Sequence, residues 1–284
     1  MTISQMSMGG LMGSPGLVDC HVHSSCSVDS SAEMEELCRR AVELGLSEIC
    51  FTEHVDFDPA EVNTGYFRYE SYRERIRESR GRFGAHLKIG AGVEIDYNRR
   101  FESDIADFLR GKTFDFVLGS VHYLNGFNVS EPRASDYFEE RDRETAYGRY
   151  FDEVEHCVRS GIFDALGHLD LVKRFGVHVY GPFEIGPFTD RIERILRLMV
   201  EQGIGLEVNT SGLRQAPKEP YPSAEVLKVY KACGGEILTV GSDAHTADDV
   251  AKGIEEAVRL LRTMDFDSIW VFERRNPRRF TQGH

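Results

Sequence analysis

Two histidines, His21 and His23, lie two residues apart in an apolar segment that reads as the first β-strand, Val18-Asp19-Cys20-His21-Val22-His23. Side chains alternate between the two faces of a strand, so both imidazoles project on the same side and can converge on one metal ion. With ten histidines in 284 residues, one such pair is a weak signal by itself. Its significance depends on the residues at the ends of the later strands.

Further imidazoles and carboxylates occur at the ends of later predicted strands: His54, Glu94, His122, His168, Asp243 and His245. In a parallel barrel the carboxyl ends of all strands share one face, so these groups would meet in one cleft. Imidazole together with carboxylate suits Zn, Fe or Mn, and a bridging carboxylate such as Glu94 can hold two cations. A single histidine at a strand end is usually structural, but the convergence of six favours metal binding.

The elements that must position these groups alternate between short apolar runs and amphipathic segments of helical length. Strands are predicted at residues 17–23, 48–54, 87–95, 114–122, 164–170, 205–209 and 236–243, and helices at 32–44, 69–83, 137–159, 187–202 and 247–262. This alternation predicts an α/β fold of βα units around a parallel sheet. An eighth, terminal strand is expected at 267–273, followed by a solvated basic tail at 274–279. Three long connections, 55–70, 123–136 and 172–188, are candidates for pocket walls.

Length and charge narrow the functional classes. A chain of 284 residues suits one α/β barrel domain, which we expect over residues 17–284 after a loose tail at 1–16. With 47 acidic against 34 basic residues, a nucleic-acid-binding surface is not expected. No apolar run approaches the ~18 to 20 residues that span a bilayer. Six cysteines without a C-x-x-C pair indicate buried thiols in a reducing cytoplasm.

The ordered set of candidate ligands resembles the polymerase and histidinol phosphatase (PHP) superfamily, whose nine metal-ligand positions can all be matched. The matching residues are His21, His23, Asp29, His54, Glu94, His122, His168, Asp243 and His245. The resemblance implies a distorted seven-stranded (βα) TIM-like barrel with two or three divalent transition metals, Zn, Mn or Fe. By analogy, His21, His23, Glu94 and Asp243 would hold the first ion. Glu94, His122 and His168 would hold the second, and Asp29, His54 and His245 the third. Asp29 could instead cap the next helix.

Four segments resemble the stand-alone histidinol-phosphate phosphatases of that superfamily: residues 51–54, 119–122, 167–174 and 207–214. The resemblance implies a metal-dependent phosphomonoesterase that hydrolyses L-histidinol phosphate to L-histidinol and phosphate in histidine biosynthesis. Glu94, Asp243 and His245 are the predicted catalytic residues.

Four other residues are predicted to bind substrate. Arg174 and Arg214 are candidate phosphate clamps, because a planar guanidinium matches phosphate oxygens, although each could form a surface salt bridge instead. Asn209, with Glu207, could orient a ligand side chain or the substrate. Asp56 or Asp96 could recognise the substrate amine, or both could be solvated loop acids.

Two alternatives stay open at this point. The protein could be a PHP phosphoesterase for another small ester, a nucleotide or a sugar phosphate. It could also be a non-catalytic, metal-bound PHP module, although the complete ligand set argues against that interpretation. If the protein is an enzyme, its partner is a small phosphorylated molecule, and neither a nucleic acid nor a membrane is expected.

Overall fold

The computed structural model describes residues 17–124 and 126–280, and its centre is a seven-stranded parallel sheet. The sheet order is β1-β2-β3-β4-β7-β8-β9. The strands are β1 (Leu17–Val22), β2 (Leu46–Val55), β3 (Lys88–Asp96), β4 (Phe116–Ser120), β7 (Ala165–Leu166), β8 (Gly205–Asn209) and β9 (Leu238–Gly241). Every residue of β4 and β8 is buried, as expected for strands covered on both faces.

The two edge strands of this sheet approach one another at their carboxyl ends. A parallel bridge joins Val22 to Ala244, the Asp243 amide donates to the His21 carbonyl at 2.8 Å, and the His23 amide donates to the Ala244 carbonyl at 2.9 Å. The sheet therefore nearly closes into a barrel, and the predicted fold class is confirmed. The predicted N-terminal tail, residues 1–16, lies outside the described residues.

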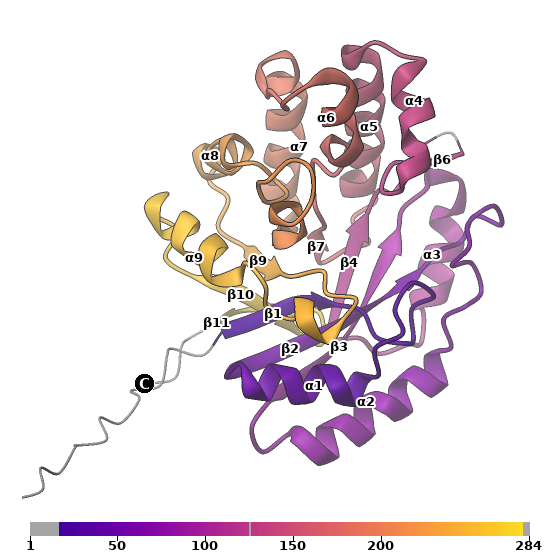
Figure 1. Ribbon diagram of the computed structural model, residues 1–284, viewed down its shortest axis with the longest axis vertical. Coiled ribbons are helices and arrows are strands. Elements are labelled where there is room, and N and C mark those ends of the chain that lie inside the picture. Colours follow the sequence, from indigo (N-terminus) through magenta and orange to yellow (C-terminus); the bar gives the residue numbers. More distant parts are fainter. Residues whose placement is uncertain (1–16, 125, 281–284) are drawn as a thin grey trace, which may run out of the picture.

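Helices surround the strands (Figure 1). They are α1 (Met34–Glu43), α2 (Tyr69–Phe83), α3 (Glu102–Leu109), α4 (Ser135–Glu139), α5 (Arg143–Arg159), α6 (Lys173–Tyr180), α7 (Thr189–Gln202), α8 (Ala224–Ala232) and α9 (Ile254–Thr263). In α7 the buried residues Ile192, Ile195, Leu196 and Met199 form the apolar stripe that packs a helix against a core. Among the helices of the described ranges, none is long and apolar enough to cross a membrane.

Several helices and one loop differ from the prediction. The predicted helix 137–159 is interrupted after Glu139, and α5 starts anew where the Asp142 side chain accepts from the Thr145 amide at 2.8 Å. The predicted helix 247–262 becomes regular only at Ile254, after Gly253 with φ 83°. Helices α3 and α8 were not predicted, and α6 lies within a segment predicted to be a loop. The loop at 123–136 contains a small hairpin, β5 (Tyr123–Leu124) with β6 (Phe127–Asn128).

The C-terminal segment differs most from the prediction. The expected eighth strand exists as β10 (Ile269–Glu273), but it pairs antiparallel with β11 (Asn276–Phe280) and not with the barrel. The basic segment 274–279, predicted to be a solvated tail, is exposed at five of its six residues but is ordered as the turn and second strand of this hairpin. Two of its arginines pair with acidic residues of the barrel. Arg278 pairs with Glu48, and Arg275 Nε lies 2.9 Å from Asp164.

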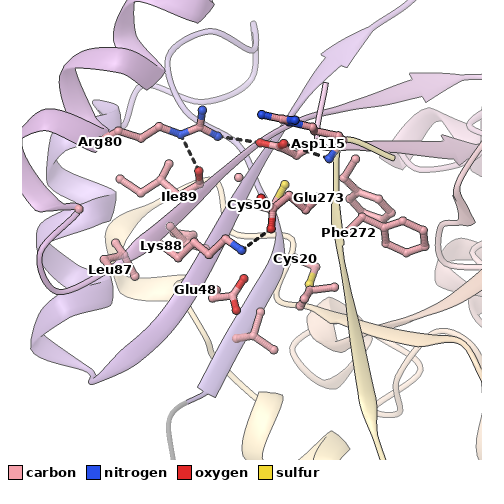
Figure 2. Close-up of a pocket in the computed structure, with 17 residues that line it drawn as sticks. Cys20, Glu48, Cys50, Arg80, Leu87, Lys88, Ile89, Asp115, Phe272 and Glu273 are labelled. Carbon is pink, nitrogen blue, oxygen red and sulfur yellow. Dashed lines mark hydrogen bonds and ion pairs between the residues drawn. The ribbon is translucent and has the colours of Figure 1, made fainter. Parts of the chain in front are cut away.

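A cavity of about 280 Å³ lies between the β10–β11 hairpin and the amino ends of β1 to β4 (Figure 2). Four of the six charged side chains in its lining form two ion pairs. Arg80 lies 2.7 Å from Asp115, and Lys88 lies 2.7 Å from Glu273. Two of the six free thiols, Cys20 and Cys50, also line it.

Candidate metal and substrate site

The opposite, carboxyl end of the barrel gathers all nine predicted metal ligands. His21, His23, Glu94 and His168 are buried, with no more than 2 % of each side chain exposed. Two of the nine occupy the left-handed backbone region that non-glycine residues rarely adopt, His168 with φ 21° and Asp243 with φ 55°. Such backbone strain concentrates at functional sites, where the surrounding structure must hold it.

The first group consists of His21, His23, Glu94 and Asp243. The Nε2 atoms of His21 and His23 are 2.9 Å apart, and Glu94 Oε2 lies 3.2 and 3.5 Å from them. Asp243 Oδ1 lies 3.7 and 3.4 Å from the same two nitrogens. Two imidazole nitrogens and two carboxylate oxygens thus surround one point, as in a four-coordinate metal site.

The second group shares Glu94 with the first. Its other oxygen, Oε1, lies 2.8 Å from His168 Nε2 and 3.5 Å from His122 Nε2, and these two nitrogens are 3.2 Å apart. Glu94 therefore directs one oxygen to each group, which is the geometry of a carboxylate that bridges two cations.

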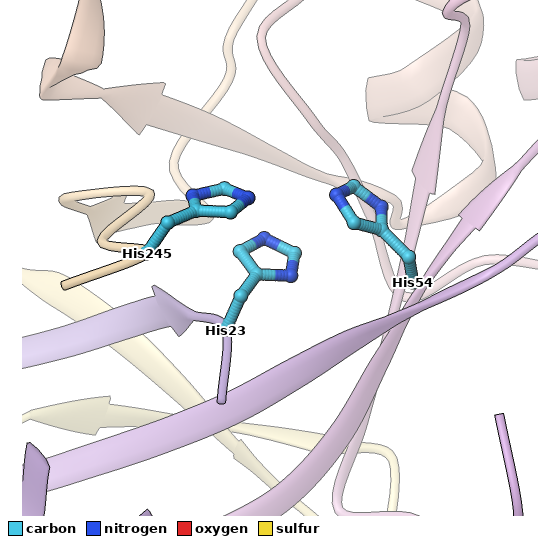
Figure 3. Close-up of side chains that lie close together, drawn as sticks. All are labelled: His23, His54 and His245. Carbon is cyan, nitrogen blue, oxygen red and sulfur yellow. The ribbon is translucent and has the colours of Figure 1, made fainter. Parts of the chain in front are cut away.

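The third group lies nearer the surface. Asp29 Oδ2 is 3.3 Å from His54 Nε2 and 3.0 Å from His245 Nε2. The imidazole of His23 lies between those of His54 and His245 (Figure 3), with ring centroids 4.2 and 4.3 Å away. His23, His54 and His245 could also hold an ion together. Asp29 does not cap the next helix, because the N-cap of α1 is Glu33.

The donor set fits divalent cations. His21 Nδ1 lies 2.5 Å from the Glu207 carboxylate, so a neutral His21 that donates its proton there presents a lone pair at Nε2. That lone pair faces another imidazole nitrogen and a Glu94 oxygen, which are also acceptors. A cation satisfies such a convergence of acceptors, and N/O ligands of this kind suit Zn²⁺.

The predicted ligands differ in their electrostatics. Burial opposes protonation of His21, but Glu207, Glu94 and Asp243 raise its pKa well above the ordinary value, so a cation at its Nε2 would displace a proton. Burial and the neighbouring His54 and His245 lower the pKa of His23 to about 3, so this imidazole is neutral and able to ligate. Burial would raise the pKa of Glu94, but His21, His122 and His54 lower it well below its ordinary value. The carboxylate is therefore ionised, as a bridging ligand must be.

A surrounding set of acids and hydroxyls orients the ligands. Glu207 holds His21 and also accepts from the His168 amide at 2.9 Å. Ser120 Oγ donates to Glu94 Oε1 at 2.6 Å. Such outer contacts fix ring orientation and raise ligand basicity. The alternation of Glu207 and Asn209 on one strand had indicated this role for Glu207.

Glu53, within the segment 51–54, was not predicted to have a role. Its buried carboxylate accepts from the Ser24 and Ser27 hydroxyls at 2.5 and 2.6 Å, and Ser27 Oγ in turn accepts from the His54 amide at 3.0 Å. An acid inside an otherwise apolar strand was the signal available in the sequence. Glu53 thereby fixes the turn between His23 and Asp29.

A cavity of about 340 Å³ opens onto the predicted metal ligands, and two of the four predicted substrate-binding residues line it. Arg174 and Asp56 line it. Arg214 is not in its lining: its Nη2 donates to the Ser242 carbonyl at 2.9 Å and its Nε lies 3.4 Å from Asp249. Asn209 is fully buried, and its Nδ2 lies 3.4 Å from Asp243 Oδ2.

Several cavity residues were not singled out from the sequence. They lie in segments without regular periodicity and include Asn63, Tyr123, Asn128, Ser130, Glu131 and Gln215. The connections 55–70 and 123–136 supply most of them, as predicted for pocket walls. Asp56 and Asp96 are 5 % and 3 % exposed, so neither is a solvated loop acid.

Comparison with known proteins identifies the family. The PHP domain model matches residues 19–211. The chain belongs to the PHP family. A probable histidinol-phosphatase of Deinococcus radiodurans is 32% identical over 250 residues, which cover 87% of this chain and 93% of that protein. The histidinol-phosphatase of Lactococcus lactis is 29% identical over 259 residues, covering 90% of this PHP protein and 94% of that one.

A solved PHP structure has the same fold. The crystal structure of histidinol phosphate phosphatase from Lactococcus lactis, complexed with Zn, L-histidinol and phosphate, superposes with a TM-score of 0.85 at 27% identity. The match covers 92% of this chain and 98% of that one.

Proposed function

We propose that this PHP protein is a metal-dependent phosphomonoesterase that hydrolyses L-histidinol phosphate to L-histidinol and phosphate, a step of histidine biosynthesis. The observation that carries the proposal is the structural match to a histidinol phosphate phosphatase complexed with Zn, L-histidinol and phosphate. Histidinol-phosphatases that align with most of this chain support it. Free thiols in the chain support the predicted cytoplasmic location.

The proposed cofactors are two or three divalent cations. The first group would hold one ion, the second group another, and Asp29, His54 and His245 a third. Zn²⁺ is the first choice because the solved relative holds it, and Mn and Fe also suit N/O donors. Bound divalent cations supply Lewis acidity, which neutralises phosphoryl oxygens and lowers the pKa of water from ~15.7 towards ~7.

The chain's own residues position the reacting phosphate. Glu94, Asp243 and His245 line the cavity, so we propose that these three act at the reacting centre. Arg174 lines the same cavity and is the proposed clamp for the phosphate oxygens, which its planar guanidinium can contact in a bidentate manner.

Arg214 and Asn209 would act less directly. Within the described residues, Arg214 Nη1 is buried without a hydrogen-bond partner, and because Arg214 does not line the cavity, it would contact phosphate only after a movement of its side chain. Asn209 contacts Asp243, and we propose that it orients this ligand. Asp56 is the proposed contact for the substrate amine.

A turnover screen tests the proposal. The protein is loaded with Zn²⁺ or Mn²⁺ and assayed against L-histidinol phosphate, phosphoserine, nucleotides and sugar phosphates. We expect the highest kcat/KM for L-histidinol phosphate. Faster turnover of a nucleotide or sugar phosphate would refute the substrate assignment and leave a PHP phosphoesterase of different specificity. No turnover of any ester by the metal-loaded protein would favour a non-catalytic module.

A further inference from the structure

Lys173, the first residue of α6, is a fully buried lysine outside the predicted site. Its Nζ donates to Asp170 Oδ2 at 2.9 Å, to Glu219 Oε1 at 3.0 Å and to the Pro220 carbonyl at 2.9 Å. The ammonium therefore uses all three of its donors. A buried ion pair adds little net stability compared with apolar side chains of similar volume, because desolvation offsets the attraction. Stability alone therefore does not explain a lysine at this position.

The acceptors of Lys173 belong to two segments that are distant in sequence. Asp170 lies in the turn that follows β7, whereas residues 219–220 lie in the connection between β8 and α8. Asp170 Oδ2 also accepts from the amide of Ser223, the residue that caps α8, at 2.9 Å. Lys173 and Asp170 thus join the loops that follow two neighbouring strands, β7 and β8.

Both joined segments reach the cavity that opens onto the predicted metal ligands. Arg174 follows Lys173 directly and lines this cavity. In the other segment, the Tyr221 backbone pairs with that of Asn209 at 2.7 and 2.9 Å. The Tyr221 hydroxyl donates to Gln215, which also lines the cavity, and the Tyr221 ring centroid lies 5.1 Å from Lys173 Nζ. Lys173 is therefore the junction between two parts of the cavity wall.

The Arg174 side chain has few contacts of its own. Its guanidinium carbon lies 5.5 Å from the Phe175 ring centroid, and it forms no ion pair within the described residues. Burial raises the pKa of the Tyr221 hydroxyl well above its ordinary value, and the charge of Arg174 opposes this rise, so the guanidinium lies near that hydroxyl. The position of Arg174 therefore depends on the backbone that carries it and on Tyr221, and Lys173 holds both.

We propose that Lys173 is a positioning residue that holds Arg174 against the reacting phosphate. This role rests on the proposed hydrolysis of a phosphate ester, in which Arg174 clamps the phosphate oxygens. Surrounding contacts must hold such a group within ~0.5 Å, and a displacement of ~1 Å can cost ~100-fold in rate. The predicted metal ligand His168 has separate anchors, because its amide donates to Glu207 and its imidazole contacts Glu94. Loss of Lys173 should therefore disturb the phosphate contact more than metal binding.

The first test replaces the ammonium on the Zn²⁺-loaded enzyme. Lys173→Met keeps most of the side-chain length but removes the three donors. We expect kcat/KM for L-histidinol phosphate and for p-nitrophenyl phosphate to fall by a similar factor, about 10- to 100-fold, with metal content by elemental analysis unchanged. Lys231→Met makes the same change at an exposed lysine of α8 and should leave turnover unchanged. Wild-type kcat/KM in folded Lys173→Met would overturn the inference.

A double variant shows whether Lys173 acts through Arg174. If it does, adding Lys173→Met to Arg174→Ala should lower kcat/KM by less than about 3-fold further, because the group that Lys173 positions is already absent. A merely structural role would lower kcat/KM by the same factor in both backgrounds. The full 10- to 100-fold further loss in the Arg174→Ala background would therefore contradict the positioning role.

A second double variant separates positioning from stability. Lys173→Met leaves Asp170 buried without its counter-charge, whereas Asp170→Asn/Lys173→Met removes both charges and keeps an acceptor for the Ser223 amide. We expect the double variant to recover most of the free energy of unfolding lost in Lys173→Met, while its kcat/KM stays at least ~10-fold below that of the wild type. This variant also replaces Lys173→Met if the single variant does not fold. Recovery of wild-type turnover together with stability would refute the inference.

Phosphate binding distinguishes this inference from the proposed function. Inorganic phosphate is titrated by calorimetry into the metal-loaded enzyme after excess metal has been removed. Its Kd should rise about 10-fold in Lys173→Met and stay unchanged in Lys231→Met. If no ester is hydrolysed but this difference is found, the positioning role stands and the proposed function fails. Equal phosphate affinity in the wild type and in folded Lys173→Met would refute the positioning role, whatever the turnover assays show.

Discussion

The two ends of the barrel differ in how their charged side chains are paired. At the amino end, beneath the β10–β11 hairpin, Arg80 is matched to Asp115 and Lys88 to Glu273, so the cavity in Figure 2 neutralises itself. At the carboxyl end, imidazole nitrogens face one another and buried carboxylates face other carboxylates. The imidazoles also share the carboxylates of Glu94 and Asp29, and this set of nitrogen and oxygen donors suits divalent cations. Charge pairing, more than cavity size, thus distinguishes a structural cavity from a binding site.

The largest effect is expected from a change to Glu94, the carboxylate shared by two ligand groups at the carboxyl end. Glu94→Gln keeps the shape of the side chain but removes the negative charge shared by two ligand groups. We expect kcat/KM for histidinol phosphate to fall by at least ~100-fold, with loss of bound metal measured by elemental analysis. Wild-type metal content and turnover in this variant would remove Glu94 from the bridging role.

Metal removal should affect stability as well as activity. Without cations, the clustered ligands at the carboxyl end lose their counter-charge, whereas the amino end keeps its internal pairs. Dialysis against a chelator should abolish turnover and lower the free energy of unfolding by about 4 kcal/mol relative to enzyme with metal at ~1,000 times Kd. Denaturant titration with and without restored Zn²⁺ measures this change, and equal stability in both states would contradict it.

Two arginines at the carboxyl end, Arg174 and Arg214, should differ in their contribution to turnover. Arg174 lines the cavity, so Arg174→Ala should depress kcat/KM for every phosphate ester by a similar factor, about 10- to 1,000-fold. Arg214 is partly occupied by Ser242 and Asp249, so Arg214→Ala should have a smaller effect. Steady-state kinetics with histidinol phosphate and p-nitrophenyl phosphate provides the comparison. A larger loss for Arg214→Ala would reverse their assigned roles.

The smallest effect is expected at the amino end. Lys88 and Glu273 are about half exposed, and such pairs contribute roughly 0 to 1 kcal/mol. Lys88→Ala should therefore change the free energy of unfolding by less than about 1 kcal/mol and leave kcat/KM unchanged. Chemical denaturation and turnover assays test both statements. A marked loss of activity would mean that the amino-end cavity serves the reaction.

The convergence of the predicted metal ligands at strand ends could be predicted because it depends largely on local rules. Alternation along β1 places His21 and His23 on one face, and parallel strands bring their carboxyl ends together. Lys173 could not be found in this way, because its partners at 219–220 lie in a connection without periodicity and approach it only when the chain folds. The same limit applies to Arg214, whose contact with Asp249 joins two segments distant in sequence.

The C-terminal segment shows a different limit. Its run of arginines has the composition of a solvated tail, and only the folded barrel reveals Glu48 and Asp164 as partners. The predicted boundaries of the helix at 137–159 were wrong for a related reason. The interruption before α5 depends on an Asp142 cap that the continuous helical pattern concealed.

Metal stoichiometry tests the central claim most directly. Nine nitrogen and oxygen ligands that converge in three groups are too many for one tetrahedral or octahedral ion. Elemental analysis of protein purified without chelators, combined with turnover of the same sample, should give two or three divalent transition metals per chain in fully active enzyme. One metal or fewer per chain with full activity would contradict a multinuclear site at the carboxyl end of the barrel.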